Sequence, residues 1–292
     1  MLFRLFIFIL LCCFTSPKVL SQSEKSENYY ADASDIIFSL EKTDESYLPK
    51  SKAVLTASAE LGFLYLTGNT RSSDVKTGID LSFEQGLWSN TLNANLLVKK
   101  SDVNNEVTPN EIDKSFETTE QKWRVVAKSS YFINSLTQNY IYGNVSYEDN
   151  RFSGFDSQYS ISAGWGRRWF ETKDYSFDAD IGPGFKRDVI QEFSPVDNEK
   201  SIKNSQDSII LQAQITFISR INEHIEFKQL GAIKHAIESG QNSVYNAESS
   251  ITSRLIDSLQ LKVSFILDYN SKVEDENKNL TTETSILLVY SF

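Results

Sequence analysis

Apolar and polar residues alternate along this chain with a period of two, in one segment after another. In residues 74–84 one face collects the apolar side chains and Thr77, and the other face collects polar residues and a glycine: Val75, Thr77, Ile79, Leu81 and Phe83 oppose Asp74, Lys76, Gly78, Asp80, Ser82 and Glu84. Successive side chains of a β-strand point to opposite faces, whereas a helix would scatter both sets around its axis. The pattern therefore predicts strands with one apolar face and one polar face.

Twelve segments follow this pattern, and the ninth and tenth follow it least clearly. They are 57–67, 74–84, 91–100, 121–131, 138–148, 157–169, 175–182, 208–218, 224–238, 244–255, 259–270 and 282–292. Most are about 9–13 residues long, and a tilted strand of about 9–11 residues crosses an outer membrane. Strands of soluble proteins usually have about 5–6 residues. The predicted fold is therefore all-β, a closed antiparallel transmembrane β-barrel of about twelve strands, with a soluble barrel as the alternative.

The connections between these segments alternate in length. The longer ones are 68–73, 101–117, 149–156, 188–206, 239–243 and 271–281, and the shorter ones are 85–90, 132–136, 170–174, 219–223 and 256–258. Outer-membrane barrels have long external loops and short periplasmic turns. The alternation predicts an even strand number with both chain ends on the periplasmic side.

The first 21 residues have the order of a signal peptide. Arg4 precedes an apolar run from Leu5 to Phe14, which is followed by polar residues and a small residue at Ser21. The run is too short to span a bilayer comfortably, which disfavours an uncleaved anchor helix. We expect a signal peptide at 1–21, a periplasmic extension at 22–53 and the barrel at 54–292. Cleavage removes Cys12 and Cys13, the only 2 cysteines, so the mature chain has no disulfide.

The chain ends on an amphipathic strand with a terminal aromatic residue. Bacterial outer-membrane barrels characteristically end in this way, and the barrel-assembly machinery recognises the ending. We therefore predict a C-terminal assembly signal at alternate positions: Ile286, Leu288, Tyr290 and Phe292. The 4 tryptophans are expected in aromatic girdles at the membrane interfaces, Trp88, Trp123 and Trp169 more than Trp165.

The polar strand faces predict a lumen that is wet or filled with paired charges. The candidate lumen-facing residues are Glu60, Asp80, Glu84, Lys122, Arg124, Lys128, Arg168, Asp178, Asp180, Lys262 and Asp268. The three cations at 122, 124 and 128 suggest a basic wall facing acidic strands. Such a field would orient a polar solute.

The same residues offer little for catalysis. Neither His224 nor His235 is followed by a serine two residues later, as a His–Ser pair on one strand face would require. Two histidines without cysteine make a poor metal site, and we expect no cofactor. With a net charge of −10 the chain lacks the broad basic surface of a nucleic-acid-binding protein.

Several short motifs, in order, resemble the YdiY-like family, whose members are labelled salt-induced outer-membrane proteins. The motifs are Gly68-Asn69-Thr70 with Trp88, residues 148–156 (EDNRFSGFD), Gly164-Trp165-Gly166-Arg167, Gly182-Pro183-Gly184-Phe185-Lys186, Tyr269-Asn270-Ser271 and the ending 288–292. Lys186 stands where the family more often has arginine. The resemblance spans residues 55–292 and implies an outer-membrane barrel without an established activity.

The function expected from the sequence is a narrow pore or solute channel with a charged lumen. A structural or salt-stress barrel with a blocked lumen is the first alternative, and a lipid-modifying enzyme is a weaker one. The expected partners are outer-membrane lipids, the barrel-assembly machinery and small polar solutes.

Overall fold

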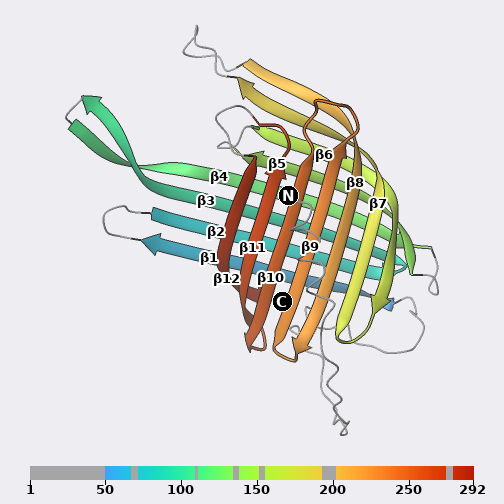
Figure 1. Cartoon of the computed structure of the whole chain (residues 1–292). Coiled ribbons are helices and arrows are strands. Elements are labelled where there is room, and N and C mark those ends of the chain that lie inside the picture. Colours follow the sequence, from blue (N-terminus) through green and yellow to red (C-terminus); the bar gives the residue numbers. More distant parts are fainter. Residues whose placement is uncertain are drawn as a thin grey trace. The chain divides into compact units, whose positions relative to one another are not determined.

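The computed structural model describes residues 50–66, 72–108, 111–133, 138–150, 155–192, 202–273 and 279–292. Within this part of the chain there are twelve strands and no helix (Figure 1). The strands are β1 (Lys50–Leu66), β2 (Ser72–Gly86), β3 (Trp88–Thr108), β4 (Glu111–Phe132), β5 (Asn139–Asn150), β6 (Ser157–Glu171), β7 (Tyr175–Glu192), β8 (Ile202–Asn222), β9 (Ile225–Ala236), β10 (Val244–Ile256), β11 (Leu259–Asn270) and β12 (Leu280–Ser291). All twelve predicted segments are strands, including the two with the weakest alternation.

The twelve strands form one closed antiparallel barrel, which confirms the predicted fold class. Each strand pairs with its neighbours in the chain, and β1 pairs with β12 to close the barrel. This seam has four register pairs, from Ser58↔Ser291 to Leu61↔Leu288. The backbone N–H of Phe292 extends it by donating to the carbonyl of Ala57 at 2.9 Å. Closure leaves no sheet edge with a full row of unsatisfied backbone groups.

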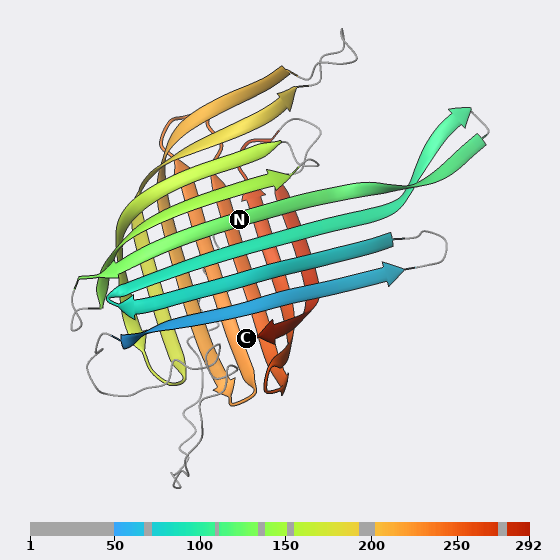
Figure 2. The ribbon, with the colours of Figure 1, turned by 180° about the vertical axis from the view of Figure 1, so that it is seen from behind.

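Two of the predicted long connections are largely strand. Residues 101–117 were expected to form a loop, but β3 runs to Thr108 and β4 starts at Glu111, so they form a hairpin that projects beyond the neighbouring strands (Figures 1 and 2). The expected loop 188–206 is likewise shortened, because β7 ends at Glu192 and β8 begins at Ile202. The alternation of apolar and polar residues fades there, since a strand that runs beyond the apolar band of a membrane barrel needs no apolar face.

The connections fall into two sets at opposite ends of the barrel. The β1–β2, β3–β4, β5–β6, β7–β8, β9–β10 and β11–β12 connections define one end, which we call the loop rim. The other end, the turn rim, carries short connections such as residues 172–174, 223–224 and 257–258. At the β2–β3 turn Gly86 has φ 58°, a conformation that glycine adopts without strain.

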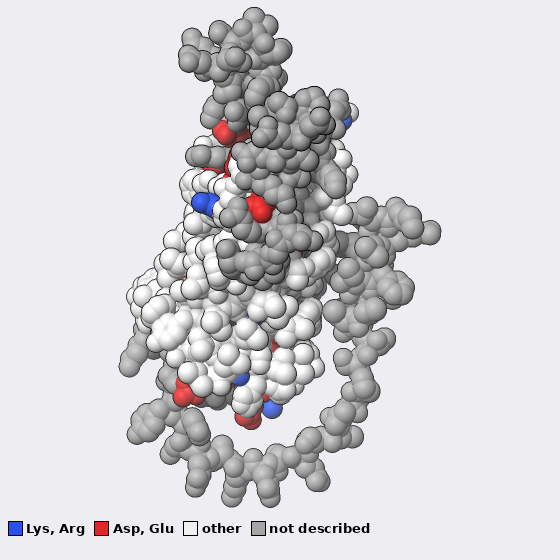
Figure 3. Space-filling view, turned by 90° about the vertical axis from the view of Figure 1, so that its left-hand side faces the viewer, with Lys and Arg blue, Asp and Glu red and all other residues white. Residues whose placement is uncertain are grey.

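The outer face of the barrel is apolar, and aromatic side chains lie toward its two ends. Large apolar side chains such as Ile141 (54% exposed) and Ile286 (64%) point away from the lumen. On the face in Figure 3, charged side chains are few across the middle and lie toward the ends. Tyr159 and Trp169 lie ten residues apart on β6. At about 3.4 Å per residue and a tilt of about 40°, they are about 26 Å apart along the barrel axis, close to the apolar band of a membrane barrel.

The tryptophans lie on the outer face, in positions that match their predicted ranking. Trp88 begins β3 at the turn rim and packs on Tyr131, with ring centroids 5.0 Å apart. Trp123 lies toward the loop rim and packs on Tyr147 at 4.5 Å. Trp165 pairs with Ile141 and Ile181 in the middle of the wall, away from both ends.

β1 begins at Lys50, four residues before the predicted start of the barrel at 54. Residues 1–49, which carry the predicted signal peptide and most of the predicted extension, lie outside the described residues. The described part of the chain includes no helix that is long and apolar enough to cross a membrane.

Candidate functional site

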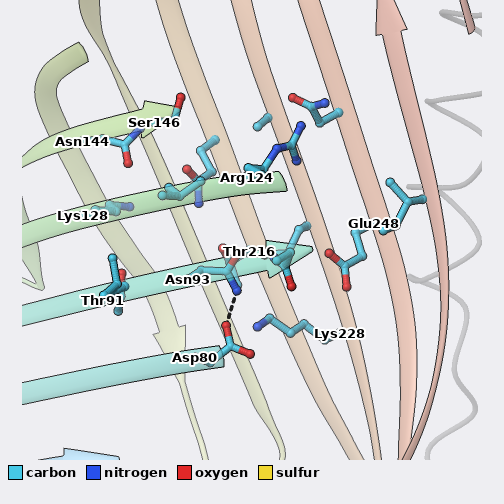
Figure 4. A pocket seen from close by; sticks show the side chains of 18 of the residues that line it. Asp80, Thr91, Asn93, Arg124, Lys128, Asn144, Ser146, Thr216, Lys228 and Glu248 are labelled. Atoms are coloured by element: carbon cyan, nitrogen blue, oxygen red, sulfur yellow. Dashed lines mark hydrogen bonds between the residues drawn. The ribbon is translucent and has the colours of Figure 1, made fainter. Parts of the chain in front are cut away.

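The barrel encloses a polar cavity of about 620 Å³. Its lining residues extend along the strands from near one rim to near the other. On β4 they run from Lys122 to Phe132, and on β9 from Glu226 to Lys234. The side chains labelled in the close view come from β2–β5 on one side of the cavity and from β8–β10 on the other (Figure 4). The volume falls in the range of about 300–1,000 Å³ that small-molecule sites usually have.

Nine of the eleven predicted lumen residues line this cavity. They are Glu60, Asp80, Lys122, Arg124, Lys128, Arg168, Asp178, Lys262 and Asp268. Asp180 is 6% exposed and lies behind the cavity wall, where its carboxylate accepts a hydrogen bond from Lys128. Glu84 lies on β2 opposite Ser89, near the turn rim, and does not line the cavity.

Four charged side chains meet across the lumen in its loop-rim half. Lys122 Nζ lies 2.6 Å from Asp268 and 3.4 Å from Glu148, and Arg124 Nη2 lies 2.7 Å from Glu148 and 3.8 Å from Asp268. Asn246 donates to Asp268 Oδ1 at 2.5 Å, while Lys122 contacts the other carboxylate oxygen. Lys122 is on β4 and Asp268 on β11, which are not neighbours in the sheet, so this group, the cross-lumen quartet, bridges the lumen.

A second set of ion pairs lies on the side of the barrel around the seam. Lys262 contacts Glu60 at 2.9 Å and Glu248 at 3.3 Å, and Lys76 contacts Glu283 at 2.6 Å. These pairs link β11 to β1 and β10, and β2 to β12. They connect strands on both sides of the short β1–β12 seam, and so they stabilise its closure.

The turn-rim half of the lumen is partly filled on the side of β4 to β7. Lys128 Nζ lies 2.5 Å from Asp180 and also over the Tyr140 and Tyr142 rings, 5.4 and 5.1 Å from their centroids. Arg168 contacts Asp178 at 3.0 Å. The cations predicted as a basic wall on β4 are thus each paired with a carboxylate, which largely cancels their field across the lumen.

Two glycine motifs make room for these buried rings. Gly164 and Gly166 on β6 and Gly182 on β7 face inward, and the two backbones approach closely there. A Cβ at Gly166 would lie 2.3 Å from the Tyr140 ring, and one at Gly182 would lie 2.1 Å from the Ala163 carbonyl oxygen. Only glycine permits this approach. The motifs Gly164-Trp165-Gly166 and Gly182-Pro183-Gly184 therefore have a shared structural role.

A third motif holds the β9–β10 connection at the loop rim. The Nδ2 of Asn242, which is 1% exposed, donates to Asn270 Oδ1 at 2.9 Å, and Ser271 Oγ accepts from the Ser243 N–H at 2.7 Å. The motif Tyr269-Asn270-Ser271 thus ties one loop-rim connection to the next. In the motif 148–156, residues 151–154 lie outside the described residues.

The family assignment follows from a match over most of the chain. A family model described as "Protein of unknown function, DUF481" covers residues 59–292, the whole barrel except the start of β1. The chain belongs to the DUF481 family. It is also similar to the "Uncharacterized protein YdiY" of Escherichia coli, with 21% identity over 267 residues, 89% of this chain and 91% of that protein. The predicted YdiY-like resemblance is confirmed.

Solved barrels resemble this DUF481 chain only distantly. The translocator domain of the autotransporter NalP from Neisseria meningitidis has a TM-score of 0.42 and 9% identity, over 82% of this chain and 88% of that one. The NanC porin has a TM-score of 0.41 and 10% identity, over 80% of this chain and 98% of that one. The strand pairing described above is therefore the basis for the barrel assignment.

Several cavity residues of the DUF481 barrel were missed by the sequence analysis. Lys228, Lys234 and Glu248 lie on β9 and β10, where the alternation is weakest, and Glu148 lies at the end of a predicted strand. The charged residues 226, 228 and 234 do share one strand face, which indicates an inward direction. Apolar residues lie between them on that face, so the alternation of polar and apolar residues was not clear.

The histidines stay outside the lumen of the DUF481 barrel. His224 lies in the β8–β9 turn and His235 near the end of β9, and both are exposed. His235 Nδ1 lies 3.3 Å from Ser243 Oγ and 3.4 Å from the Tyr245 hydroxyl. Among the described residues no group of three or more His, Cys, Asp and Glu side chains is arranged to hold a metal ion.

Proposed function

We propose that the chain is an outer-membrane barrel that forms a narrow passage for small polar solutes. One observation carries the proposal: a single polar cavity is lined by residues from near the loop rim, such as Lys234, to near the turn rim, such as Glu226. A lumen built only for stability would be filled by side chains from end to end. Hydroxyl, amide and charged groups along the cavity replace the hydration of a polar solute.

The membrane location is supported by the outer face. Its apolar side chains and the aromatic residues toward both ends match the surface that contacts lipid in outer-membrane barrels. The four residues of the predicted assembly signal, at 286, 288, 290 and 292, all point outward and are 64%, 46%, 47% and 64% exposed. In this position they are available to the barrel-assembly machinery before the seam closes.

We infer that the cross-lumen quartet is the main constriction of the proposed passage. Because Lys122 and Asp268 reach each other from strands that are not neighbours, their side chains occupy space through which a solute must pass. The double variant Lys122→Ser with Asp268→Ser removes both side chains and leaves neither charge without its main partner. We expect single-channel conductance in planar bilayers to rise by about twofold or more, since the narrowest segment dominates the resistance.

A matched control is the pair Lys99 and Glu120. These residues are 2.6 Å apart, on neighbouring strands toward the loop rim, and do not line the cavity. The double variant Lys99→Ser with Glu120→Ser should leave conductance unchanged. Equal conductance of the wild type and the two double variants would mean that the quartet does not limit the flow of ions through the passage.

The cross-lumen quartet also supports a second candidate function, a structural or salt-stress barrel with a blocked lumen. In that case the wild-type barrel does not conduct, and the Lys122→Ser/Asp268→Ser barrel does. For either role we propose that the chain is not an enzyme, because its inward groups are engaged mainly in ion pairs.

A further inference from the structure

Lys234 differs from the other lumen cations in the loop-rim half of the cavity. The two carboxylates whose charges act on it are Glu148 and Asp188. Glu148 is already paired with Arg124 and Lys122, and Asp188 with Lys186. Within the described part of the chain Lys234 forms no ion pair of its own. Lys234 is half-buried, and a cation largely withdrawn from water without a carboxylate partner is unusual, because burying a charge is costly unless it is compensated.

The Lys234 ammonium has donors to spare. It gives one hydrogen bond, to Ser146 Oγ at 2.7 Å, and Ser146 in turn is 2.7 Å from Ser160 Oγ. An ammonium group has three N–H donors, so two remain for another acceptor. The bond to Ser146 crosses the lumen from β9 to β5 and fixes the amine in the cavity, which both residues line.

Two residues near Lys234 or its partner Ser146 carry buried acceptors without partners among the described groups. Gln212 is 2% exposed, pairs in register with Lys234 and lines the cavity, and its Oε1 has no partner among the described groups. Asn144 is 4% exposed, lies two residues from Ser146, and its Oδ1 is likewise without a partner there. Buried polar atoms are usually hydrogen-bonded, and these two unpartnered acceptors belong to residues that line the same cavity as Lys234, so they are available to a ligand there.

We propose that Lys234, Gln212 and Asn144 form a subsite for a small organic carboxylate that also carries hydroxyl groups. The carboxylate accepts from the two remaining donors of Lys234, and the hydroxyls donate to Gln212 Oε1 and Asn144 Oδ1. The subsite requires both parts of such a ligand, since an uncharged polyol leaves Lys234 uncompensated and a hydroxyl-free acid leaves the two acceptors unsatisfied. The inference rests on the proposed passage in that the solute must reach the cavity.

The test measures equilibrium binding of small probe molecules to the full barrel folded in detergent. Saturation-transfer NMR detects the bound probe during a titration. Three probes with the same carbon number separate the need for a carboxylate from the need for hydroxyl groups. Gluconate has both, sorbitol has only hydroxyl groups, and hexanoate has only the carboxylate. Gluconate should bind about tenfold or more tighter than either, as expected for a charge-assisted hydrogen bond to a buried group.

The decisive variant is Lys234→Met, with Lys228→Met as its control. Lys228 lies on the same face of β9, lines the cavity and also forms no ion pair within the described residues, but it belongs to the turn-rim half. Lys234→Met should weaken gluconate binding about tenfold or more, Lys234→Arg should retain most of it, and Lys228→Met should bind like the wild type. A gel-mobility shift on heating verifies that each variant is folded.

Equal binding of the three probes, or unchanged gluconate binding by Lys234→Met, would overturn the subsite. An equal loss in Lys228→Met would overturn it as well, because it would point to a diffuse charge effect. The result is separate from the proposed passage: a barrel that binds gluconate through Lys234 but carries no current refutes the passage and leaves the subsite standing.

Discussion

The close approach of β6 and β7 predicts that Gly182 accepts no side chain. A Cβ at Gly182 would lie 2.1 Å from the Ala163 carbonyl oxygen, 2.6 Å from Gly164 Cα and 2.7 Å from the Ala163 carbonyl carbon. All three are backbone atoms, so no rotamer change relieves the contact. Gly182→Ala must push the strands apart by about 1 Å to restore ordinary van der Waals contact, and overpacking of this kind costs about 1–3 kcal/mol.

Gly143→Ala is the matched control. Gly143 lies in the next hairpin, on the outer face of β5, and a Cβ there would have nothing within 4 Å. Replacing glycine by alanine in such a strand should be neutral or should stabilise by about 0.5–1 kcal/mol, because the unfolded chain loses freedom. The two variants should therefore differ by about 1–4 kcal/mol in the free energy of unfolding.

The assay is urea unfolding of the barrel in phospholipid vesicles, with tryptophan fluorescence as the recorded signal. All four tryptophans lie on the outer face, so their emission reports the loss of contact with lipid. We expect a lower urea midpoint for Gly182→Ala and an unchanged or higher one for Gly143→Ala. If the two variants unfold at the same urea concentration, then the close strand approach does not determine the glycine motif and the reasoning is wrong.

Three further predictions follow from the seam, the lipid-facing surface and the chain end. Cysteines introduced at Ser58 and Ser291, which are register partners, should form a disulfide in a chain from which the predicted signal peptide with Cys12 and Cys13 has been deleted, and failure to oxidise in folded protein would contradict closure at this seam. Lipids brominated near the headgroups should quench Trp123 and Trp169 more than Trp165, when measured in proteins that keep one of these tryptophans; equal quenching would contradict the girdle assignment. Phe292→Ala should lower the amount of barrel assembled in cells severalfold while leaving refolding in detergent nearly unchanged, because its exposed ring adds little to packing. An equal loss in both settings would indicate a structural role.

The fold was predictable because every strand of the barrel has one face toward lipid and one face toward the lumen. A residue that faces lipid must be apolar and its neighbour that faces the lumen need not be, so alternation located even β9 and β10. The hairpin at 101–117 was missed because that rule does not apply where a strand leaves the apolar band. The register pairs between β3 and β4 nevertheless continue through this hairpin.

The lumen was predictable by face but not by partner. Strand alternation gave the inward direction of Lys122, Lys128 and Asp268, yet which carboxylate each cation meets depends on the barrel's stagger. The Lys122–Asp268 contact joins residues far apart in the sequence, and no local pattern encodes it. The role of the glycines was hidden for the same reason, because the atoms that exclude a Cβ at Gly182 belong to another strand.

The central claim is that a polar cavity runs through the barrel and admits solutes. Single-channel recording of the wild-type protein in planar lipid bilayers tests this claim most directly, with the heat-dependent gel shift as the check that the protein is folded. Discrete current steps, enlarged in the Lys122→Ser/Asp268→Ser variant, are the predicted result. Folded barrels that leave the bilayer sealed, in the wild type and in that variant alike, would contradict the claim.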